Sequence, residues 1–543
     1  MSGAQGNIVD LHHGEIFPGA IHVKDGHIVR IERLAGPFDR FLIPGFVDAH
    51  IHIESSLLAP AEFSRAASVH GTVATVSDPH EIANVLGVDG VDYMITESRR
   101  AGIKIFLGAP SCVPATSFES AGAILDAAAV AGLLARPEIY FLSEVMNFPG
   151  VLQGDPDLLA KIAAAKKLGK PVDGHAPQLR HLQAAAYAKA GISTDHECTS
   201  LPEALDKIAA GMKILIREGS AARNYDALEP LLFSHPESCM FCSDDLHPDA
   251  LAVGHINLLV RRAVAAGVDP ITALRIACAN PVAHYRLPVG LLCEGDPADF
   301  LVVSDLRDFR VRETWVGGNL IAREGKSLRP FEKPPLLNRF AAAPITPAAL
   351  RIPCPKPSAQ VEIIAVEDGQ LITGRASHPM TARNGELTSD TGRDFLKIAV
   401  LSRYHASAAP ALAFITNFGL QHGAIASSIA HDSHNIIAVG VSDEALCRAI
   451  NLIVENQGGV CAVSAKGECI LPLPIAGLMS DREATAAAHG YAAVEHFARD
   501  LGSPLRAPLM TLSFMALLVI PELKLSDRGL FDGAAFRFTP LMN

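Results

Sequence analysis

The chain has 543 residues, of which 49% are hydrophobic and 19% charged, and its formal net charge is −12. This length is enough for two or three domains with large cores, and the composition excludes a chain that is disordered throughout. Because the balance is acidic and no basic tract occurs, a nucleic acid is not expected as a partner.

The N-terminal stretch and the cysteines indicate the compartment. The first residues, MSGAQGNIVD, contain no apolar signal-peptide region. The longest apolar stretch, residues 507–520, is shorter than the roughly 20 apolar residues that a membrane span needs. The ten cysteines are scattered, and the spaced pair Cys239 and Cys242 has no second pair with which to bind a metal. We therefore expect a cytoplasmic protein with reduced thiols and no membrane partner.

From residue 42 onwards, short apolar runs alternate with Ala- and Leu-rich stretches that have the apolar spacing of helices. The runs that we predict to be strands are residues 41–50, 72–78, 103–109, 138–144, 170–175, 192–197, 213–217 and 239–245. Eight strands that alternate with helices predict an α/β fold, a (β/α)8 TIM-type barrel over residues 42–291. The alternative is an open doubly wound sheet, but no Gly-rich dinucleotide loop follows the early strands.

The segments on either side of the barrel have different patterns. Residues 1–41 contain alternating strands around a Lys-Asp-Gly turn, which is a hairpin signal, and residues 292–330 contain short strands around a Gly-Gly turn. Neither segment could bury both of its faces alone, so we expect the two to pair in one small β domain. After a Pro-rich linker, residues 348–543 mix strands with helices, which predicts a C-terminal α+β domain.

Side chains of the kind that bind metals stand at the ends of the predicted strands. Catalytic groups of such a barrel lie at the C-terminal ends of its strands. His50 and His52 are two positions apart, so on a strand they point the same way. The residues at strand ends are His50 with His52, Asp78, Glu144, His175, His196 and Asp244.

Four histidines and at least two carboxylates at one barrel mouth are more than one metal ion needs. Nitrogen and oxygen ligands without thiolates suit Zn, Mn, Fe or Co. We predict two divalent ions, most simply Mn²⁺ or Fe²⁺ with Zn²⁺ as an alternative, which would turn a shared water into hydroxide. The predicted ligands are His50, His52 and Asp244 for one ion, His175 and His196 for the other, and Glu144 as the bridge.

Several motifs resemble those of one enzyme group. The run PGFVDAHIH, the histidines that close strands five and six, and the aspartate that closes strand eight resemble the amidohydrolase superfamily. More narrowly, the chain resembles the adenine deaminase family in the motifs VSDPHEIANVLG, LSEVMNFPGV, DGHAP, DHECTS, FCSDDLHPD and AHDSHN. Members of the wider superfamily with two metals often use a carboxylated lysine as the bridge. The glutamate at position 144 instead agrees with the narrower family.

The resemblance implies hydrolytic removal of the 6-amino group of adenine, which gives hypoxanthine and ammonia in purine salvage. Attack at C6 breaks aromaticity, so a metal-activated hydroxide and a carboxylate that moves its proton are expected. Asp244 is the expected proton carrier, with Asp245 as the alternative. The open candidates for protonation of the purine ring are Glu197, Asp78, His80 and Glu81.

Some alternatives stay open. The pair His431 and His434 is either part of a turn held by Asp432 and Ser433, a lid over the barrel mouth, or a further metal site. A cyclic amidohydrolase that acts on a pyrimidine- or imidazole-derived ring is the alternative enzyme, and a non-catalytic scaffold is a third reading. Besides adenine as the small-molecule substrate, we expect a homo-oligomer, most simply a dimer, because closed twofold assemblies are the commonest.

Overall fold

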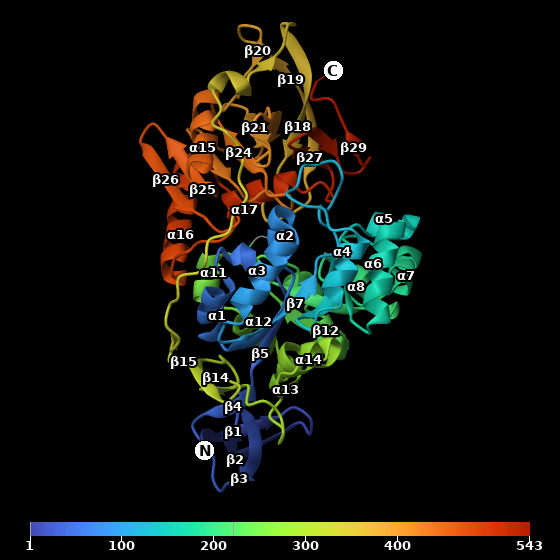
Figure 1. Cartoon of the computed structure of the whole chain (residues 1–543), viewed down its shortest axis with the longest axis vertical. Helices are drawn as coiled ribbons and strands as arrows, with labels where there is room; N and C mark the ends of the chain where they lie inside the picture. The colour runs from blue at the N-terminus through green and yellow to red at the C-terminus, as the bar shows by residue number, and fades with distance from the viewer. Residues whose placement is uncertain (1, 221, 543) are drawn as a thin grey trace.

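The structure is a computed structural model, and it describes residues 2–220 and 222–542. Along the long axis of the molecule, three parts follow one another (Figure 1). A small sheet lies at the bottom, the barrel in the middle, and the C-terminal region, residues 348–542, at the top. One end of the barrel therefore faces the C-terminal region.

Eight parallel strands form the barrel, and each overlaps a run that the sequence predicts to be a strand. Their bounds are β5 (Phe46–Ile51), β6 (Thr72–Ser77), β7 (Lys104–Ala109), β8 (Ile139–Val145), β9 (Val172–Gly174), β10 (Thr194–Asp195), β11 (Lys213–Arg217) and β12 (Cys239–Cys242). Most of their residues are buried, which explains why they appear in the sequence as apolar runs rather than as alternating patterns.

Backbone hydrogen bonds close these strands into a ring. Strands β5 to β9 pair in order, as do β10 to β12. Between β9 and β10, Ser193 N donates to Val172 O at 2.8 Å. Between β12 and β5, Asp244 N donates to His50 O at 2.9 Å, and His52 N donates to Asp244 O at 3.3 Å. The predicted TIM-type barrel is confirmed.

Helices connect the barrel strands and follow the last of them. They are η1 (Ile53–Ser56), α1 (Pro60–Ser68), α2 (His80–Leu86), α3 (Val88–Ser98), α4 (Ala127–Leu134), α5 (Phe148–Gln153), α6 (Pro156–Lys167), α7 (His181–Ala190), α8 (Leu201–Ala209), α9 (Tyr225–Leu228), α10 (Leu231–Ser234), η2 (Pro236–Ser238), α11 (Pro248–Val253), α12 (Ile256–Ala265), α13 (Pro270–Leu274), η3 (Arg275–Ala279) and α14 (Asn280–Tyr285). Helix α6 shows how the sequence starts them: the Asp155 carboxylate accepts hydrogen bonds from the backbone N–H groups of Asp157 and Leu158.

The first predicted strand, residues 41–50, is in fact two strands, and this corrects the sequence-based expectation. β4 (Phe41–Pro44) belongs to the small sheet, whereas β5 belongs to the barrel. The chain changes sheets at Gly45, where a Cβ atom would lie 2.2 Å from Val73 Cγ1. Only glycine permits this close approach, and the continuous apolar run hides the break.

The small sheet joins segments from both sides of the barrel. Its strands lie in the order β16-β15-β14-β13-β4-β1-β2-β3, and the two segments meet where β13 pairs with β4. Their bounds are β1 (Ser2–Asp10), β2 (Glu15–Lys24), β3 (His27–Arg33), β13 (Phe300–Val303), β14 (Val311–Val316), β15 (Asn319–Arg323) and β16 (Lys326–Ser327).

The C-terminal region contains a second eight-stranded sheet, in the order β19-β18-β22-β21-β24-β23-β25-β26, and α15 packs against β23, β24 and β25. Its elements are η4 (Pro347–Leu350), β17 (Ile352–Pro353), β18 (Ser358–Ala365), β19 (Gly374–Thr381), β20 (Glu386–Leu387), β21 (Leu396–Leu401), β22 (Ala411–Thr416), β23 (Ala424–Ser427), β24 (Ile436–Gly440), α15 (Asp443–Glu455), β25 (Gly459–Ser464), β26 (Gly467–Pro472), α16 (Ala484–Asp500), α17 (Pro508–Ser513), η5 (Phe514–Ala516), β27 (Leu523–Ser526), β28 (Gly529–Asp532) and β29 (Arg537–Phe538).

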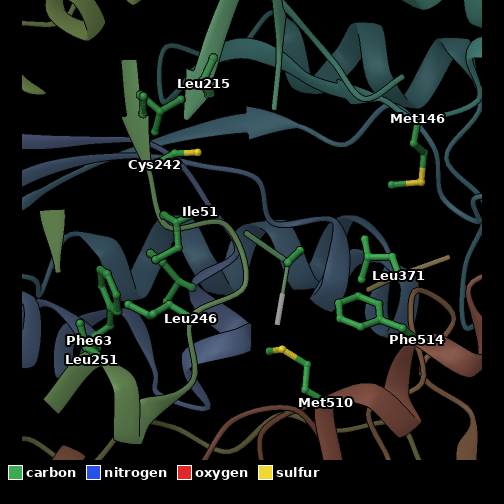
Figure 2. Packing of buried hydrophobic residues seen from close by; sticks show 14 of the residues in the cluster. Ile51, Phe63, Met146, Leu215, Cys242, Leu246, Leu251, Leu371, Met510 and Phe514 are labelled. Atoms are coloured by element: carbon green, nitrogen blue, oxygen red, sulfur yellow. The ribbon is translucent and has the colours of Figure 1, made fainter. Parts of the chain in front are cut away.

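One apolar core continues from the barrel into the C-terminal region. Ile51 of β5 and Leu215 of β11 belong to the same buried cluster as Leu371, Met510 and Phe514. Figure 2 shows Leu371 and Phe514 next to each other on the C-terminal side of this core. Burial of this shared surface stabilises the contact of the C-terminal region with the barrel.

All ten cysteines are free thiols. In the described part of the chain, no helix combines the length and the apolar character needed to cross a membrane.

Candidate metal centre and active site

The structure brings all six predicted metal ligands together at the barrel mouth. They lie at the ends of five strands of the ring, and each side chain is at most 8% exposed. They are His50 at the end of β5, His52 before η1, Glu144 in β8, His175 after β9, His196 after β10 and Asp244 after β12. The rule that functional groups gather at the C-terminal ends of barrel strands therefore holds for each of them.

Three of these residues surround one position. His50 Nε2 lies 3.2 Å from His52 Nε2, and Asp244 Oδ1 lies 3.3 Å from the first and 3.2 Å from the second. Ligand atoms bound to one ion at about 2.0–2.2 Å in a tetrahedral site are roughly 3.3–3.6 Å apart. The spacing of these three atoms fits a shared divalent ion.

Glu144 faces two groups of ligands, one with each oxygen. Its Oε1 atom lies 3.3 Å from His52 Nε2. Its Oε2 atom lies 2.7 Å from His175 Nδ1 and 3.1 Å from His196 Nε2. A carboxylate oriented in this way can bridge two ions, and the nitrogen and oxygen donor set suits divalent transition metals.

The backbone and neighbouring groups orient the ligands. His52 Nδ1 lies 3.1 Å from the carbonyl oxygen of Asp78, which fixes the proton on Nδ1 and leaves the lone pair on Nε2 for a metal. Asp244 has a φ of 53°, in the left-handed region that aspartate adopts more readily than most residues. This conformation is held by the two backbone bonds between Asp244 and β5, so the position of its carboxylate depends on closure of the ring.

Arg217 is the important residue that the sequence analysis missed. It ends β11, and its Nη1 atom donates to Oε1 of Glu197 at 2.5 Å and also to Oδ2 of Asp244. Burial acts to raise the pKa of Asp244, but Arg217 and the neighbouring histidines lower the pKa to well below its usual range. Burial also acts to raise the pKa of Glu197, but Arg217 and the neighbouring histidines lower the pKa below its usual value. The position of Arg217 at the end of the seventh strand could have indicated a role in the site. The sequence analysis considered only metal-binding side chains at strand ends, and arginine is not one of them.

The other predicted carboxylates occupy distinct places around the mouth. Glu197 Oε1 lies 3.6 Å from His196 Nε2 and 3.7 Å from His175 Nδ1, so it is next to the metal-binding histidines. Asp245 Oδ1 instead accepts a hydrogen bond from Ser55 Oγ at 2.5 Å. All three carboxylates at the ends of strands six and eight are therefore buried near the candidate centre.

Comparison with known proteins identifies the group to which this chain belongs. The profile of the Amidohydrolase family matches residues 41–321, and the profile of the Adenine deaminase C-terminal domain matches residues 370–537. A protein named adenine deaminase from Salinibacter ruber is 54% identical, over 98% of this chain and 97% of that protein. The chain belongs to the adenine deaminase family. Adenine deaminases of Sulfurovum sp. and Methanosarcina acetivorans are 52% and 50% identical, each over at least 98% of both chains.

In this adenine deaminase family member, the C-terminal region forms part of the candidate active site. The cavity at the barrel mouth is lined from the barrel side by Met146 and by all of the candidate ligands except His50. From the other side it is lined by Leu371, His431, Asp432, Phe514 and Leu517. The AHDSHN motif therefore lies over the barrel mouth, as the lid interpretation predicts, and its residues 431–434 also form a turn.

The contact between the two sides is made by Glu81 at the start of α2. His431 Nδ1 lies 2.9 Å from Glu81 Oε1, and His434 Nε2 contacts Glu81 Oε2. Burial acts to raise the pKa of Glu81, but the two histidines lower it to well below its usual range. This predicted catalytic residue is thus held as a carboxylate by two residues that are about 350 positions away in the sequence.

Proposed function

We propose that the protein catalyses the hydrolytic deamination of adenine to hypoxanthine and ammonia. One observation carries the proposal: in a chain of the adenine deaminase family, each oxygen of Glu144 faces a separate group of buried metal-type ligands. The full-length similarity to relatives that are named adenine deaminase favours adenine over the ring of a cyclic amide.

The six residues at the mouth fit a pair of divalent ions, and we assign His50, His52 and Asp244 to one ion and His175 and His196 to the other. Glu144 would bridge the two. Such a pair of ions would supply a hydroxide near neutral pH and stabilise the negative charge that develops during hydrolysis. Because the donors are imidazoles and carboxylates without thiolates, we propose Mn²⁺ or Fe²⁺, with Zn²⁺ as an alternative.

Asp244 is the proposed proton carrier of the reaction. Its Oδ1 atom is directed between His50 and His52, and Arg217 holds its Oδ2 atom. The ionised carboxylate can accept a proton from the water that attacks C6 of adenine, and can then pass that proton to the departing amino group. The water oxygen becomes the new oxygen at C6, and the protonated amino group leaves as ammonia.

The second proton of the water must end on a ring nitrogen of the product. Glu197 is the better placed of the two predicted carboxylates, since it adjoins His175 and His196. As an ionised group it must first accept a proton before it donates one to the ring. Glu81 has both oxygens engaged by histidines of the C-terminal region, so we assign the ring proton to Glu197.

The apolar side of the cavity is the proposed position of the purine ring. Met146 enters from the barrel, and Leu371, Phe514 and Leu517 enter from the C-terminal region. Apolar and aromatic side chains are the usual lining of a site for a flat heterocycle, with a few polar groups to orient it. The cavity has a volume of only about 20 Å³. Adenine would thus lie between the two parts of the molecule after they move apart to admit it.

The division into domains and the cellular context also remain proposals. We propose a small β domain of residues 1–41 and 292–330, a catalytic barrel of residues 42–291, and a C-terminal α+β domain of residues 348–543. The ten free thiols favour a reducing compartment such as the cytoplasm. The homo-oligomer, most simply a dimer, stays a prediction.

The deciding experiment is an assay of the purified full chain, loaded with Mn²⁺, with adenine as the substrate. We expect hypoxanthine and ammonia to form in equal amounts, measured by chromatography and by an ammonia-coupled assay. Asp244→Asn, prepared in parallel, controls for a contaminating deaminase. Hydrolysis of a dihydropyrimidine or an imidazolone in place of adenine would instead support the cyclic amidohydrolase.

A further inference from the structure

A second cluster of buried metal-type ligands lies beside the candidate centre, where α2 of the barrel meets the C-terminal loop. His80 and Glu81 begin α2, whereas His431 and Asp432 belong to the loop that precedes β24. All four side chains are buried. We propose that these four residues bind a third divalent metal ion, which joins the barrel to the C-terminal region.

The spacing of the four ligand atoms fits one ion. His80 Nε2 lies 3.6 Å from Glu81 Oε1 and 3.8 Å from Asp432 Oδ1. His431 Nδ1 lies 2.9 Å and 3.6 Å from the same two oxygens. Neighbouring ligands of a tetrahedral ion with bonds of about 2.0–2.2 Å are roughly 3.3–3.6 Å apart. Two of the four distances match this range, the distance from His80 to Asp432 is slightly longer, and the distance from His431 to Glu81 is shorter.

The hydrogen bond of the His80 ring also supports a metal ion at this position. Its Nδ1 atom lies 3.0 Å from Asp78 Oδ2, so the ring donates a proton there and carries a lone pair on Nε2. A carboxylate behind an imidazole is the usual arrangement of a metal-binding histidine, and it orients the ring. The Asp78 carboxylate does for His80 what the Asp78 carbonyl oxygen does for His52.

Two atoms of the cluster are otherwise unexplained. His80 Nε2 and Asp432 Oδ2 are buried and have no hydrogen-bond partner among the described residues. A lone pair that faces carboxylate oxygens at 3.6–3.8 Å is too distant for a hydrogen bond and is repelled by them. A cation between the three groups removes the repulsion and gives His80 Nε2 a partner, with Asp432 binding through Oδ1.

His434 completes the arrangement from behind. It contacts Oε2 of Glu81, the oxygen on the other side of the carboxylate from the ion, and thereby directs Oε1 toward the cluster. Two imidazoles and two carboxylates again form a nitrogen and oxygen set that suits Mn, Fe, Co or Zn. The third ion would thus use the same metals as the catalytic pair.

The third ion would hold the C-terminal loop in place over the barrel mouth. It would fix the loop with His431 against α2, and the His431 ring stacks on Phe514 at a centroid distance of 4.6 Å. Phe514 lines the cavity in which we place the purine. With Glu81 as a metal ligand, its carboxylate is not free to protonate the ring, which agrees with the assignment of that step to Glu197.

The metal content of the full chain tests the inference. The protein is loaded with Mn²⁺, freed of loosely bound ions by gel filtration, and analysed by mass spectrometry. We expect Asp432→Asn to retain one ion per chain fewer than the wild type, because a neutral amide is a weak ligand. Ser433→Ala, in the same loop, is the matched control and should retain as many ions as the wild type. Equal metal content in Asp432→Asn and the wild type would overturn the proposal.

Anomalous diffraction from Mn²⁺-loaded wild-type crystals gives a second result that does not depend on a variant that folds. A peak between His80 Nε2 and His431 Nδ1 is expected, in addition to the peaks of the catalytic pair. Peaks at the catalytic pair without this third one would contradict the inference. Because both readouts locate or count one particular ion, they are independent of whether the chain deaminates adenine.

Discussion

Arg217 donates through Nη1 to the carboxylate oxygen of Asp244 that does not face His50 and His52. The same nitrogen donates to Glu197. One guanidinium therefore positions the two carboxylates to which we assign the proton transfers, and its single positive charge offsets part of their negative charge. Together with the neighbouring histidines, Arg217 offsets the repulsion between two like charges that are buried next to each other.

Removal of the guanidinium should be costly for both stability and rate. In Arg217→Met, two buried carboxylates lose their cation, and we expect the free energy of unfolding to fall by about 3–5 kcal/mol. The value of kcat should fall as well, since Asp244 and Glu197 lose their orientation. Denaturant unfolding and steady-state kinetics measure the two effects. The exposed Arg223, in the same segment, supplies the control Arg223→Met, which should change stability by no more than about 0.5 kcal/mol.

Asp244→Asn should abolish proton transfer while keeping the shape of the side chain. General acid–base catalysis contributes about 10² to 10⁴ in rate, so kcat should fall by at least that factor. Metal content should fall less than in a variant of His50 or His175, which lose a nitrogen ligand entirely. Asp245, which accepts from Ser55, gives the comparison Asp245→Asn, which should stay within about tenfold of the wild-type rate. If the two variants exchanged behaviour, Asp245 would be the proton carrier.

Glu144→Gln should lower the metal content as well as the rate. A neutral amide cannot bridge two cations as a carboxylate does, and the ligand groups on its two sides would each lose an anionic donor. Metal analysis of the variant beside the wild type measures the effect. Wild-type metal content in this variant would show that the bridge lies elsewhere.

Removal of metal should abolish activity reversibly. After dialysis against a chelator, we expect no deamination of adenine, and we expect Mn²⁺ or Fe²⁺ to restore the rate at least as well as Zn²⁺. The measurement is the initial rate after titration of each metal into the apoprotein. Full activity in exhaustively metal-free protein would rule out the two-ion centre.

Lys524 should make stability depend on pH above neutrality. Its Nζ atom is buried and donates to the carbonyl oxygens of Leu371 and Phe514, and burial lowers the pKa of Lys524 to about 7. The amine of the unfolded chain has a pKa near its usual value of about 10.4, so between pH 7 and pH 10 unfolding takes up a proton. The contribution of Lys524 to the free energy of unfolding therefore rises with pH, by up to about 1.4 kcal/mol per pH unit.

The variant Lys524→Met removes that slope. Denaturant unfolding at pH 7.5, 8.5 and 9.5 should show the free energy of unfolding of the wild type rising relative to that of the variant. The exposed Lys466 provides the control, and Lys466→Met should keep the slope of the wild type. Identical slopes in the wild type and Lys524→Met would mean that the buried amine stays protonated.

The sequence by itself determined the barrel and the residues at its mouth. Strands buried on both faces are continuous apolar runs, and parallel strands direct their C-terminal ends to one side. Residues such as His175 and Asp244 could therefore be placed together from their positions after such runs alone. The resemblance of the motifs to one family was confirmed by the match to the family profiles and by relatives that are similar over nearly the full chain.

The tertiary structure alone decided the contacts that depend on packing between distant segments. No local pattern indicates that Glu81 meets His431, because their contact follows from how the C-terminal region docks on the barrel. Nor does any pattern reveal that Arg217 pairs with Asp244: the two residues end neighbouring strands, but the direction of the Arg217 side chain is set only by packing in the folded chain. The break at Gly45 was hidden for the same reason: the close approach of Val73 that requires a glycine exists only in the folded chain.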